Sequence, residues 1–373
     1  VNENGLIEDV ATGVPRLDYT DSGCPVLLLE PQRTNLITYS EDFTQGAWIK
    51  VGTSVVSDNA ISPNGTLDAT KLVESSASED HRIDFQGVST SSGSKYSLSL
   101  FVKANGRSIV KVRDFATNAY INVDLETNTI LTTNLVNSTG KCEDLGNDWK
   151  RISFTFTASS SVLIRIYTEI ADNTSNYQGD GTSGLYIWGA QLELGSYPTS
   201  YIPTVGTTVT RVAETCNGSG NSEVFNDSEG VLMVEISAFE EIPTTSEHIV
   251  LRNSASTDFS NSILIQHRTD GNLRIYADGF STGNIQFIVT DMNWLVNNKI
   301  AIQYDSIGSN YKLFLNGTTK ARYSSAANQS VVGLNDISFY WGSANNPFYG
   351  NTKQIQYFDT ALTDQELIAL TAL

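Results

Sequence analysis

The chain has 373 residues, of which 40% are hydrophobic and only 17% are charged, and its formal net charge is −18. This length exceeds what a single hydrophobic core usually organises, so we expect two domains. The negative charge repels phosphate backbones and anionic lipid surfaces, which argues against partners such as nucleic acid or a membrane. No apolar run approaches the roughly 18 residues of a membrane-spanning helix, so no membrane span is expected.

The cysteines, Cys24, Cys142 and Cys216, are three in number and widely spaced, without a C-x-x-C pair. An odd, scattered set disfavours a disulfide framework or a zinc site and suits folding in a reducing cytoplasm. Because the chain begins with Val1 rather than Met, we expect it to be a processed product or part of a longer protein.

Residues 1–37 are predicted to form an extended lead-in, with a short apolar strand at 26–29 between Pro25 and Pro31. Residues 38–204 then contain short runs in which apolar and polar side chains alternate, separated by turn-forming residues. A period of two predicts strands, and their close spacing predicts an antiparallel sandwich. The clearest runs are 96–102, 108–113, 151–156 and 162–167.

The last strand of this region is expected to place Leu185, Ile187 and Gly189 on one face and the residues between them on the other. Pro198 and Pro203 follow, and proline cannot donate to a strand ladder. We therefore expect the sheet to end here and the chain to leave it in an extended conformation.

Residues 205–228 are predicted to be a flexible linker, since 217–222 are almost entirely Gly, Ser and Asn. Residues 229–373 carry a second set of strand-like runs, one of which ends in an Asn316-Gly317 hairpin turn. Residues 363–366, Thr-Asp-Gln-Glu, form a capping-box pattern that predicts a short helix. The expected fold class is therefore all-β, with two tandem antiparallel β-sandwiches (jelly rolls) and one short C-terminal helix.

Residues 188–204, WGAQLELGSYPTSYIPT, resemble the end of the carbohydrate-binding-module-like jelly roll that is common in bacteriophage tail and head-fibre proteins. The same proteins often carry stretches close to PRLDY and LLEPQRTNL near the start and VTR-A after the domain, here at 15–19, 28–36 and 209–213. In the second half, KLFLNG and YFDTALTDQEL resemble laminin-G-like domains of the concanavalin-A-like superfamily.

These resemblances imply a jelly roll over 38–204 and a laminin-G/concanavalin-A-like sandwich over 229–373. They also imply a virion protein of a phage tail or head fibre, made in the cytoplasm of the host bacterium. Its expected partners are other virion proteins, two further copies of itself in a homotrimer, and a bacterial surface polysaccharide bound for host attachment. The chain has no heptad run that would itself predict a trimer.

No catalytic constellation stands out, so we expect a protein that is not an enzyme. Concanavalin-A-like glucanases carry E-x-D-x-x-E, but here Ser237 replaces the Asp, and simple alternation puts Glu235 and Glu240 on opposite faces. Residues 266–268, Gln-His-Arg, are adjacent, whereas a uronate lyase needs such side chains in one groove. The chain lacks G-x-S-x-G, Walker A and dinucleotide motifs.

Two alternatives to a glycan-binding fibre protein stay open at this point. One is a structural virion spacer or decoration protein without a ligand. The other is a polysaccharide lyase or glycosidase whose site has no recognisable pattern, or the binding module of such an enzyme.

Aromatic side chains at strand ends and loops of the second domain are the candidate glycan-binding residues, because sugar rings stack their C–H faces on aromatic rings. In a sandwich the same side chains commonly fill the core. The candidates are Trp294, Tyr340, Trp341, Phe348 and Tyr349, with Trp48, Tyr167, Tyr186 and Trp188 as possible counterparts in the first domain.

Calcium is the expected cofactor, if there is one. The sugar-binding jelly rolls that the chain resembles often hold a structural Ca²⁺ where the first and last strands meet, and Glu41, Asp42 and Glu193 are predicted near that place. Such oxygen ligands suit Ca²⁺, although solvated surface carboxylates would produce the same pattern.

Overall fold

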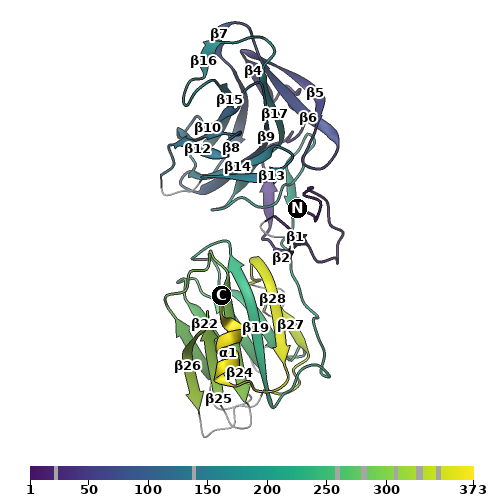
Figure 1. Ribbon diagram of the computed structural model, residues 1–373, viewed down its shortest axis with the longest axis vertical. Coiled ribbons are helices and arrows are strands. Elements are labelled where there is room, and N and C mark those ends of the chain that lie inside the picture. The colour runs from purple at the N-terminus through teal and green to yellow at the C-terminus, as the bar shows by residue number, and fades with distance from the viewer. Residues whose placement is uncertain are drawn as a thin grey trace. The chain divides into compact units, whose positions relative to one another are not determined.

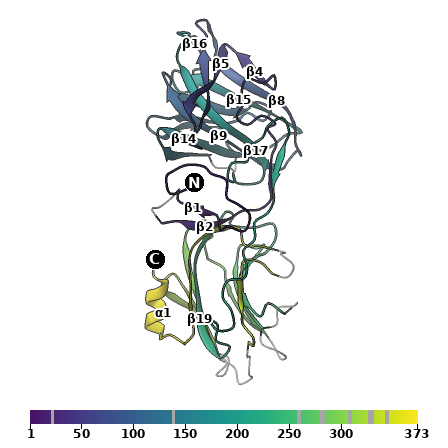
Figure 2. The ribbon, with the colours of Figure 1, turned by 90° about the vertical axis from the view of Figure 1, so that its right-hand side faces the viewer.

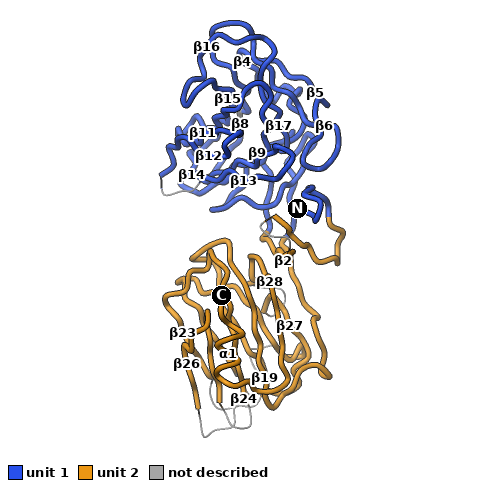
Figure 3. The backbone as a smooth tube through the Cα atoms, viewed as in Figure 1, with its two compact units in different colours: residues 1–9, 32–212 blue, residues 10–31, 213–373 orange. Residues whose placement is uncertain are grey.

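The computed structural model describes residues 1–20, 24–136, 140–256, 261–278, 284–305, 310–324, 331–341 and 346–373. The chain divides into two compact units (Figure 3). Unit 1 consists of residues 1–9 and 32–212, and unit 2 of residues 10–31 and 213–373. The regular structure is strands apart from one short C-terminal helix in the described part of the chain, which confirms the all-β class expected from the sequence.

Unit 1 contains two antiparallel six-stranded sheets (Figure 1). The first sheet has the spatial order β12 (Thr129–Thr133), β11 (Ala119–Asp124), β10 (Ile109–Asp114), β15 (Ser161–Glu169), β8 (Arg82–Ser89), β4 (Trp48–Val51). The second has the order β13 (Gly140–Gly146), β14 (Trp149–Thr157), β9 (Lys95–Asn105), β17 (Gly184–Leu194), β6 (Leu67–Glu74), β5 (Thr53–Ile61). Two small pairs, β7 (Ser78–Asp80) with β16 (Asn176–Gln178) and β3 (Arg33–Asn35) with β18 (Val209–Arg211), complete the unit.

The core of unit 1 is built from alternate side chains of these strands. Val110 and Val112 of β10 and Ile164 and Ile166 of β15 are fully buried in one cluster with the inner residues of the second sheet. Because neighbouring side chains on a strand point to opposite faces, the residues between them lie on the outer face of the first sheet.

A bulge at Gly189 changes the face of the last strand of unit 1. Leu185 and Ile187 point into the core as expected, but the register of β17 against β9 shifts after Trp188, and Ala190 and Leu192 become the next core residues. Gly189 has φ +63°, and a Cβ there would lie 2.7 Å from the Phe101 ring. Simple alternation, which put Gly189 with Leu185 and Ile187, therefore does not hold beyond the bulge.

The proline-containing segment 196–204 is held by buried polar side chains next to β17. The Glu193 carboxylate accepts hydrogen bonds from the Thr199 amide at 2.7 Å and the Thr199 hydroxyl at 2.6 Å. Gln191 accepts from the Ile202 amide at 2.7 Å, and Asn35 donates to the Ile202 carbonyl at 2.9 Å. The motif that carries the phage-fibre resemblance thus stabilises the end of the sandwich.

Unit 2 is a sandwich of a seven-stranded and a five-stranded antiparallel sheet, which Figure 2 presents edge-on as two layers. The larger sheet has the order β1 (Leu17–Asp18), β2 (Val26–Leu29), β28 (Gly350–Phe358), β19 (Glu229–Ala238), β24 (Asn298–Asp305), β25 (Asn310–Leu315), β26 (Thr318–Ser324). The smaller has the order β23 (Asn284–Val289), β22 (Leu273–Asp278), β21 (Ser262–His267), β20 (Glu247–Arg252), β27 (Asp336–Ser338).

Helix α1 (Asp364–Thr371) packs on the larger sheet against β24, β25 and β26. Figure 2 shows it outside the layer that contains β19. Thr363 and Glu366 form the expected capping box, in which each side chain bonds the backbone amide of the other. Leu367 is fully buried against Val231 and Phe314.

The boundaries of the two units differ from those expected. The predicted lead-in over 1–37 is shared between the units, because the apolar run 26–29 forms strand β2 and pairs with β28 of unit 2. The predicted linker over 205–228 is ordered at both ends: β18 pairs with β3 in unit 1, and Phe225 lies in the core of unit 2.

Candidate functional site

The outer face of the first sheet of unit 1 carries charged and aromatic side chains. We call this surface the polar sheet face. Its side chains come from the four central strands and from the turn that follows β10: Arg82, Asp84, Lys111, Arg113, Phe115, Tyr120, Asn122, Arg165, Tyr167 and Glu169.

The strand register arranges these side chains in two rows that cross the strands. In one row Tyr120, Arg113, Arg165 and Asp84 are successive cross-strand partners. The second row consists of Asn122, Lys111, Tyr167 and Arg82. Directly opposed side chains of an antiparallel pair interact, so each row forms a continuous surface.

Asp84 is a buried carboxylate shared by two arginines. Arg82 Nε lies 3.1 Å from one carboxylate oxygen of Asp84, and Arg165 Nε lies 3.5 Å from the other. Burial raises the pKa of Asp84 in spite of these neighbours. Arg82 has a second carboxylate, Asp80, at 2.9 Å, whereas Arg165 pairs among the described residues only with the shared one.

Arg113 has no ion pair and no hydrogen bond from its side chain within the described residues, and it lies directly opposite Arg165. Both guanidinium groups lie over the Phe115 ring, with ring-centroid distances of 4.9 Å for Arg113 and 3.6 Å for Arg165. The Nε atoms of both arginines are buried without a hydrogen-bond partner in the part of the chain that is described. The ring holds the two cations together without neutralising them.

At the end of the second row, Glu169 and Asp172 share the side-chain amide of Asn122. Asn122 Nδ2 donates to Glu169 at 2.7 Å and to Asp172 at 2.7 Å. Glu169 is 1% exposed, and burial raises its pKa. Thr132 Oγ1 also donates to Asp172, at 2.9 Å.

The aromatic residues of unit 2 that were predicted to bind a glycan do not form one surface. Trp294 and Phe348 are 0% and 2% exposed in the core, so the prediction is wrong for these two side chains, whose rings have no face open to a ligand. Trp294 stacks on His267 and donates to the Gly271 carbonyl at 2.9 Å.

The other three aromatic candidates lie near one another in the chain, at Tyr340, Trp341 and Tyr349. Tyr340 is 9% exposed, and its hydroxyl accepts from the Asn217 amide at 2.8 Å. Trp341 and Tyr349 are half-buried and stay candidates. Residues 342–345, part of the loop expected between them, lie outside the described residues.

The predicted calcium ligands do not come together. Glu193 is fully buried and its oxygens accept three hydrogen bonds, Glu41 accepts from the Tyr201 hydroxyl at 2.9 Å, and the exposed Asp42 caps the turn at Thr44 and Gln45. Among the described residues, no group of three or more His, Cys, Asp or Glu side chains could hold a metal ion. Glu41, Asp42 and Glu193 therefore serve as local hydrogen-bond acceptors.

The side chains weighed as catalytic have separate structural partners. Glu235 pairs with Lys353 at 3.0 Å. Gln266 donates to His248 at 2.8 Å, while its neighbour His267 contacts Trp294, so the two side chains have different surroundings, as alternation predicts. In the described part of the chain no helix is long and apolar enough to cross a membrane.

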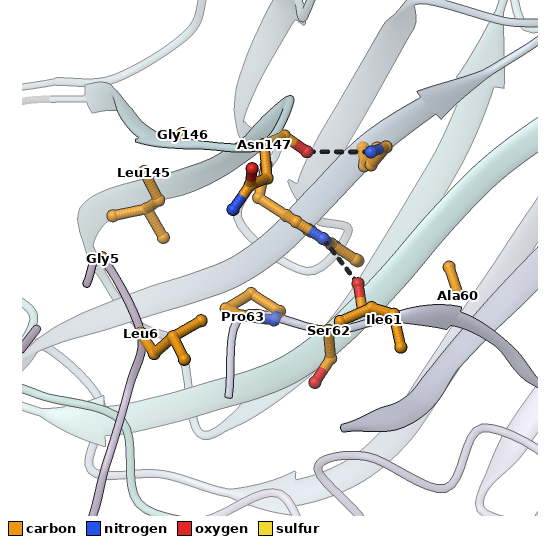
Figure 4. A pocket seen from close by; sticks show the side chains of 11 residues that line it. Gly5, Leu6, Ala60, Ile61, Ser62, Pro63, Leu145, Gly146 and Asn147 are labelled. Atoms are coloured by element: carbon orange, nitrogen blue, oxygen red, sulfur yellow. Dashed lines mark hydrogen bonds between the residues drawn. The ribbon is translucent and has the colours of Figure 1, made fainter. Parts of the chain in front are cut away.

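A pocket of about 420 Å³ also lies in unit 1, between Leu6, Ile61, Pro63 and Leu145 (Figure 4). Its polar groups already pair within the protein: Trp149 Nε1 donates to the Ile61 carbonyl at 2.9 Å, and Lys103 Nζ to the Asn147 carbonyl at 2.8 Å. The polar sheet face, where Arg113 has neither an ion pair nor a side-chain hydrogen bond among the described residues, is the stronger candidate site.

Sequence reasoning identified two of the four strands of the polar sheet face, but not the face itself. The runs 108–113 and 162–167 were recognised from their apolar positions, and Tyr167 was weighed as an aromatic candidate. The missed signal lies in the alternate positions of these runs, where Lys111, Arg113 and Arg165 place charged side chains on the outward face.

No protein-family model matches the chain, and no curated protein matches it at a significant level. Among solved structures, the Ruminococcus gnavus IT-sialidase CBM40 bound to α2,3-sialyllactose is 19% identical over 42% of this chain and 94% of its own, with a TM-score of 0.35. A leech intramolecular trans-sialidase is 20% identical over 42% and 26% of the two chains, with a TM-score of 0.35. The heptameric SAP-like pentraxin of Limulus polyphemus is 11% identical over 41% and 73%, with a TM-score of 0.34. Similarity at this level assigns neither a fold nor a ligand to this chain.

Proposed function

We propose that this protein binds acidic glycans without cleaving them, and that the polar sheet face of unit 1 is the binding surface. The observation that carries the proposal is the opposed pair Arg113 and Arg165, which between them have, among the described residues, only part of one carboxylate, that of Asp84. Like charges directly opposite each other destabilise a sheet, so such a pair favours an anion as its third member.

The chemistry of the neighbouring side chains suits a carbohydrate. Phe115, which lies under the two guanidinium groups, is 44% exposed and leaves part of an aromatic ring at the surface. A guanidinium group donates two parallel hydrogen bonds to a carboxylate or a sulfate, while an aromatic ring accepts the apolar face of the sugar. In a chain of net charge −18, the Arg113 guanidinium also attracts an acidic ligand to this face.

We further propose that the protein acts in a phage tail or head fibre, where it attaches the virion to a bacterial surface polysaccharide. The resemblance of residues 188–204 and their companion stretches to phage-fibre jelly rolls supports this setting. Assembly as a homotrimer with other virion proteins is part of the same proposal.

The test measures binding of the purified chain to acidic surface polysaccharides and to the same polysaccharides after chemical reduction of their carboxyl groups. We expect the acidic form to bind more tightly. Arg113→Gln should weaken that binding roughly 10- to 100-fold, the equivalent of one or two hydrogen bonds to a charged group. Because Arg113 makes no ion pair or side-chain hydrogen bond among the described residues and contacts only the exposed Phe115 ring there, this variant should keep the wild-type fold.

The matched control is Arg322→Gln in unit 2, which removes the same charge from an exposed ion pair with Asp364 and should leave binding unchanged. Binding lost in Trp341→Ala but kept in Arg113→Gln would move the site to unit 2. An absence of binding to any surface glycan would leave a structural virion part, and released oligosaccharides would mean that the protein is an enzyme.

A further inference from the structure

Two buried oxygen atoms near the end of the polar sheet face have no partner in the described residues. They are Asn122 Oδ1 and Glu169 Oε1, on side chains that are 0% and 1% exposed. A buried acceptor without a donor is costly, and it commonly marks the place of an ion or an ordered water. Since both atoms are buried, a small ion reaches them more readily than a sugar does.

The surroundings of these oxygens are those of a cation site. Asn122 Nδ2 lies 2.7 Å from an oxygen of Glu169 and 2.7 Å from an oxygen of Asp172, so the amide holds two carboxylates together that would otherwise repel each other. Electrostatic repulsion from Asp172 adds to the burial that raises the pKa of Glu169. Asp172 Oδ1 also accepts hydrogen bonds from Thr132 Oγ1 at 2.9 Å and from Asn173 Nδ2 at 3.2 Å, and these neutral donors compensate the negative charge only in part.

We propose that Asn122, Glu169, Asp172 and Thr132 form a binding site for a calcium ion. A rotation of the Asn122 amide about its terminal torsion would exchange Nδ2 for Oδ1 between the two carboxylates. Ligand oxygens at about 2.4 Å from Ca²⁺ in a pentagonal arrangement lie roughly 2.8 Å apart, close to the separations that already exist here. The rotation thus converts a hydrogen-bonded bridge into a ligand set.

The ligand chemistry favours Ca²⁺ over Mg²⁺. The group offers two carboxylates, a neutral amide oxygen and the Thr132 hydroxyl, which lies 2.9 Å from Asp172. Calcium accepts six to eight such oxygens in flexible geometry, whereas Mg²⁺ requires near-octahedral coordination at shorter distances. Asp172 is exposed, which leaves a path for the ion and positions for water ligands.

Lys111 is the nearby charge that opposes the cation. Its ammonium group bonds Asn173 at 2.6 Å and lies 4.3 Å from the centre of the Tyr120 ring. Replacement of this residue, Lys111→Gln, should therefore tighten calcium binding, a response that a purely structural polar cluster would not give.

The test is a calorimetric titration of the full chain with CaCl₂ and with MgCl₂, together with its melting temperature in Ca²⁺ and in EDTA. At about 10 mM Ca²⁺, a calcium site with the weak affinity typical of extracellular modules should raise the melting temperature of unit 1 by a few degrees. Glu169→Gln, which preserves the shape of the side chain, should lose the response. Asn122→Asp should bind Ca²⁺ more tightly and melt lower in EDTA, where three carboxylates repel one another.

The matched control is Asp124→Asn on the same strand. Its carboxylate accepts hydrogen bonds from the Glu126 amide and the Thr127 hydroxyl of the adjacent turn, and the variant should leave the calcium response unchanged. The proposal is overturned if the wild-type chain shows no Ca²⁺-dependent heat or melting shift. It is also overturned if a shift is retained in folded Glu169→Gln and unchanged in Asn122→Asp.

Discussion

Removal of the Glu193 carboxylate should lower the free energy of unfolding of unit 1. It should not change the response of the protein to Ca²⁺. In Glu193→Ala the buried Thr199 amide loses its acceptor, which costs about 1–3 kcal/mol, and the Thr199 hydroxyl loses a bond to a charged group worth about 1.5–3 kcal/mol. The side-chain amide of Gln191 also loses its bond to Glu193, but at a smaller cost, because the Thr199 and Ser200 carbonyls lie 3.4 and 3.3 Å from its nitrogen and remain as acceptors. Relief of the buried charge offsets part of this cost, so we expect a loss of about 3–4 kcal/mol.

Differential scanning calorimetry measures this loss as a shift of the unit 1 transition. For a domain of this size about 1 kcal/mol corresponds to 2–4 °C, so the transition should fall by roughly 6–16 °C. The control Asp42→Ala removes an exposed carboxylate from a turn and should cost under about 1 kcal/mol. An unchanged transition in Glu193→Ala would refute the role of the network, and a calcium response abolished by Asp42→Ala would restore the site predicted from the sequence.

Two further predictions concern unit 2. Trp294→Ala should lower the stability of this unit by about 3–5 kcal/mol in urea unfolding, because it leaves a cavity at a fully buried position. Trp341→Ala, at a half-buried position, should cost far less. Equal urea midpoints for the two variants would contradict the burial of Trp294. Burial lowers the pKa of His248 to about 4, so between its ordinary value of 6.5 and 4 the unfolded chain binds a proton that the folded chain does not. Unit 2 should lose about 3 kcal/mol as the pH falls through this interval, measured by urea unfolding at each pH, and His248→Gln should flatten the dependence; a wild-type stability that is constant between pH 7 and 4 would contradict the assignment.

The sequence was informative about the fold because strand formation follows local patterns. The alternation of the runs 108–113 and 162–167, the Asn316-Gly317 turn and the capping box at Thr363 each act within a few residues, and the structure contains all of them. The reversal of faces at Gly189 could not be predicted by alternation, since the bulge depends on the approach of Phe101 from a strand far away in the chain.

The candidate site was harder to predict because it depends on register between distant strands. Nothing local in the sequence pairs Arg113 with Arg165 or brings Asn122 to Glu169. The aromatic residues of unit 2 gave a misleading signal for a related reason: Trp294 precedes a loop-like stretch, but tertiary packing on His267 buries it in the core.

The division of the chain between its units has a consequence for synthesis on the ribosome. Strand β2, an apolar Val-Leu-Leu-Leu run, pairs with β28 through Leu27, Leu28 and Leu29. Its partner emerges roughly 300 residues later, after the whole of unit 1, so this pairing is among the most non-local in the chain. Until β28 has been synthesised, the backbone groups of β2 that pair with it stay free and its leucines stay exposed to solvent. Exposed apolar strands of this kind make a nascent chain prone to aggregation. Closure of this edge is therefore expected to be the final folding event, and a fragment that begins after unit 1 would leave one edge of β28 permanently open.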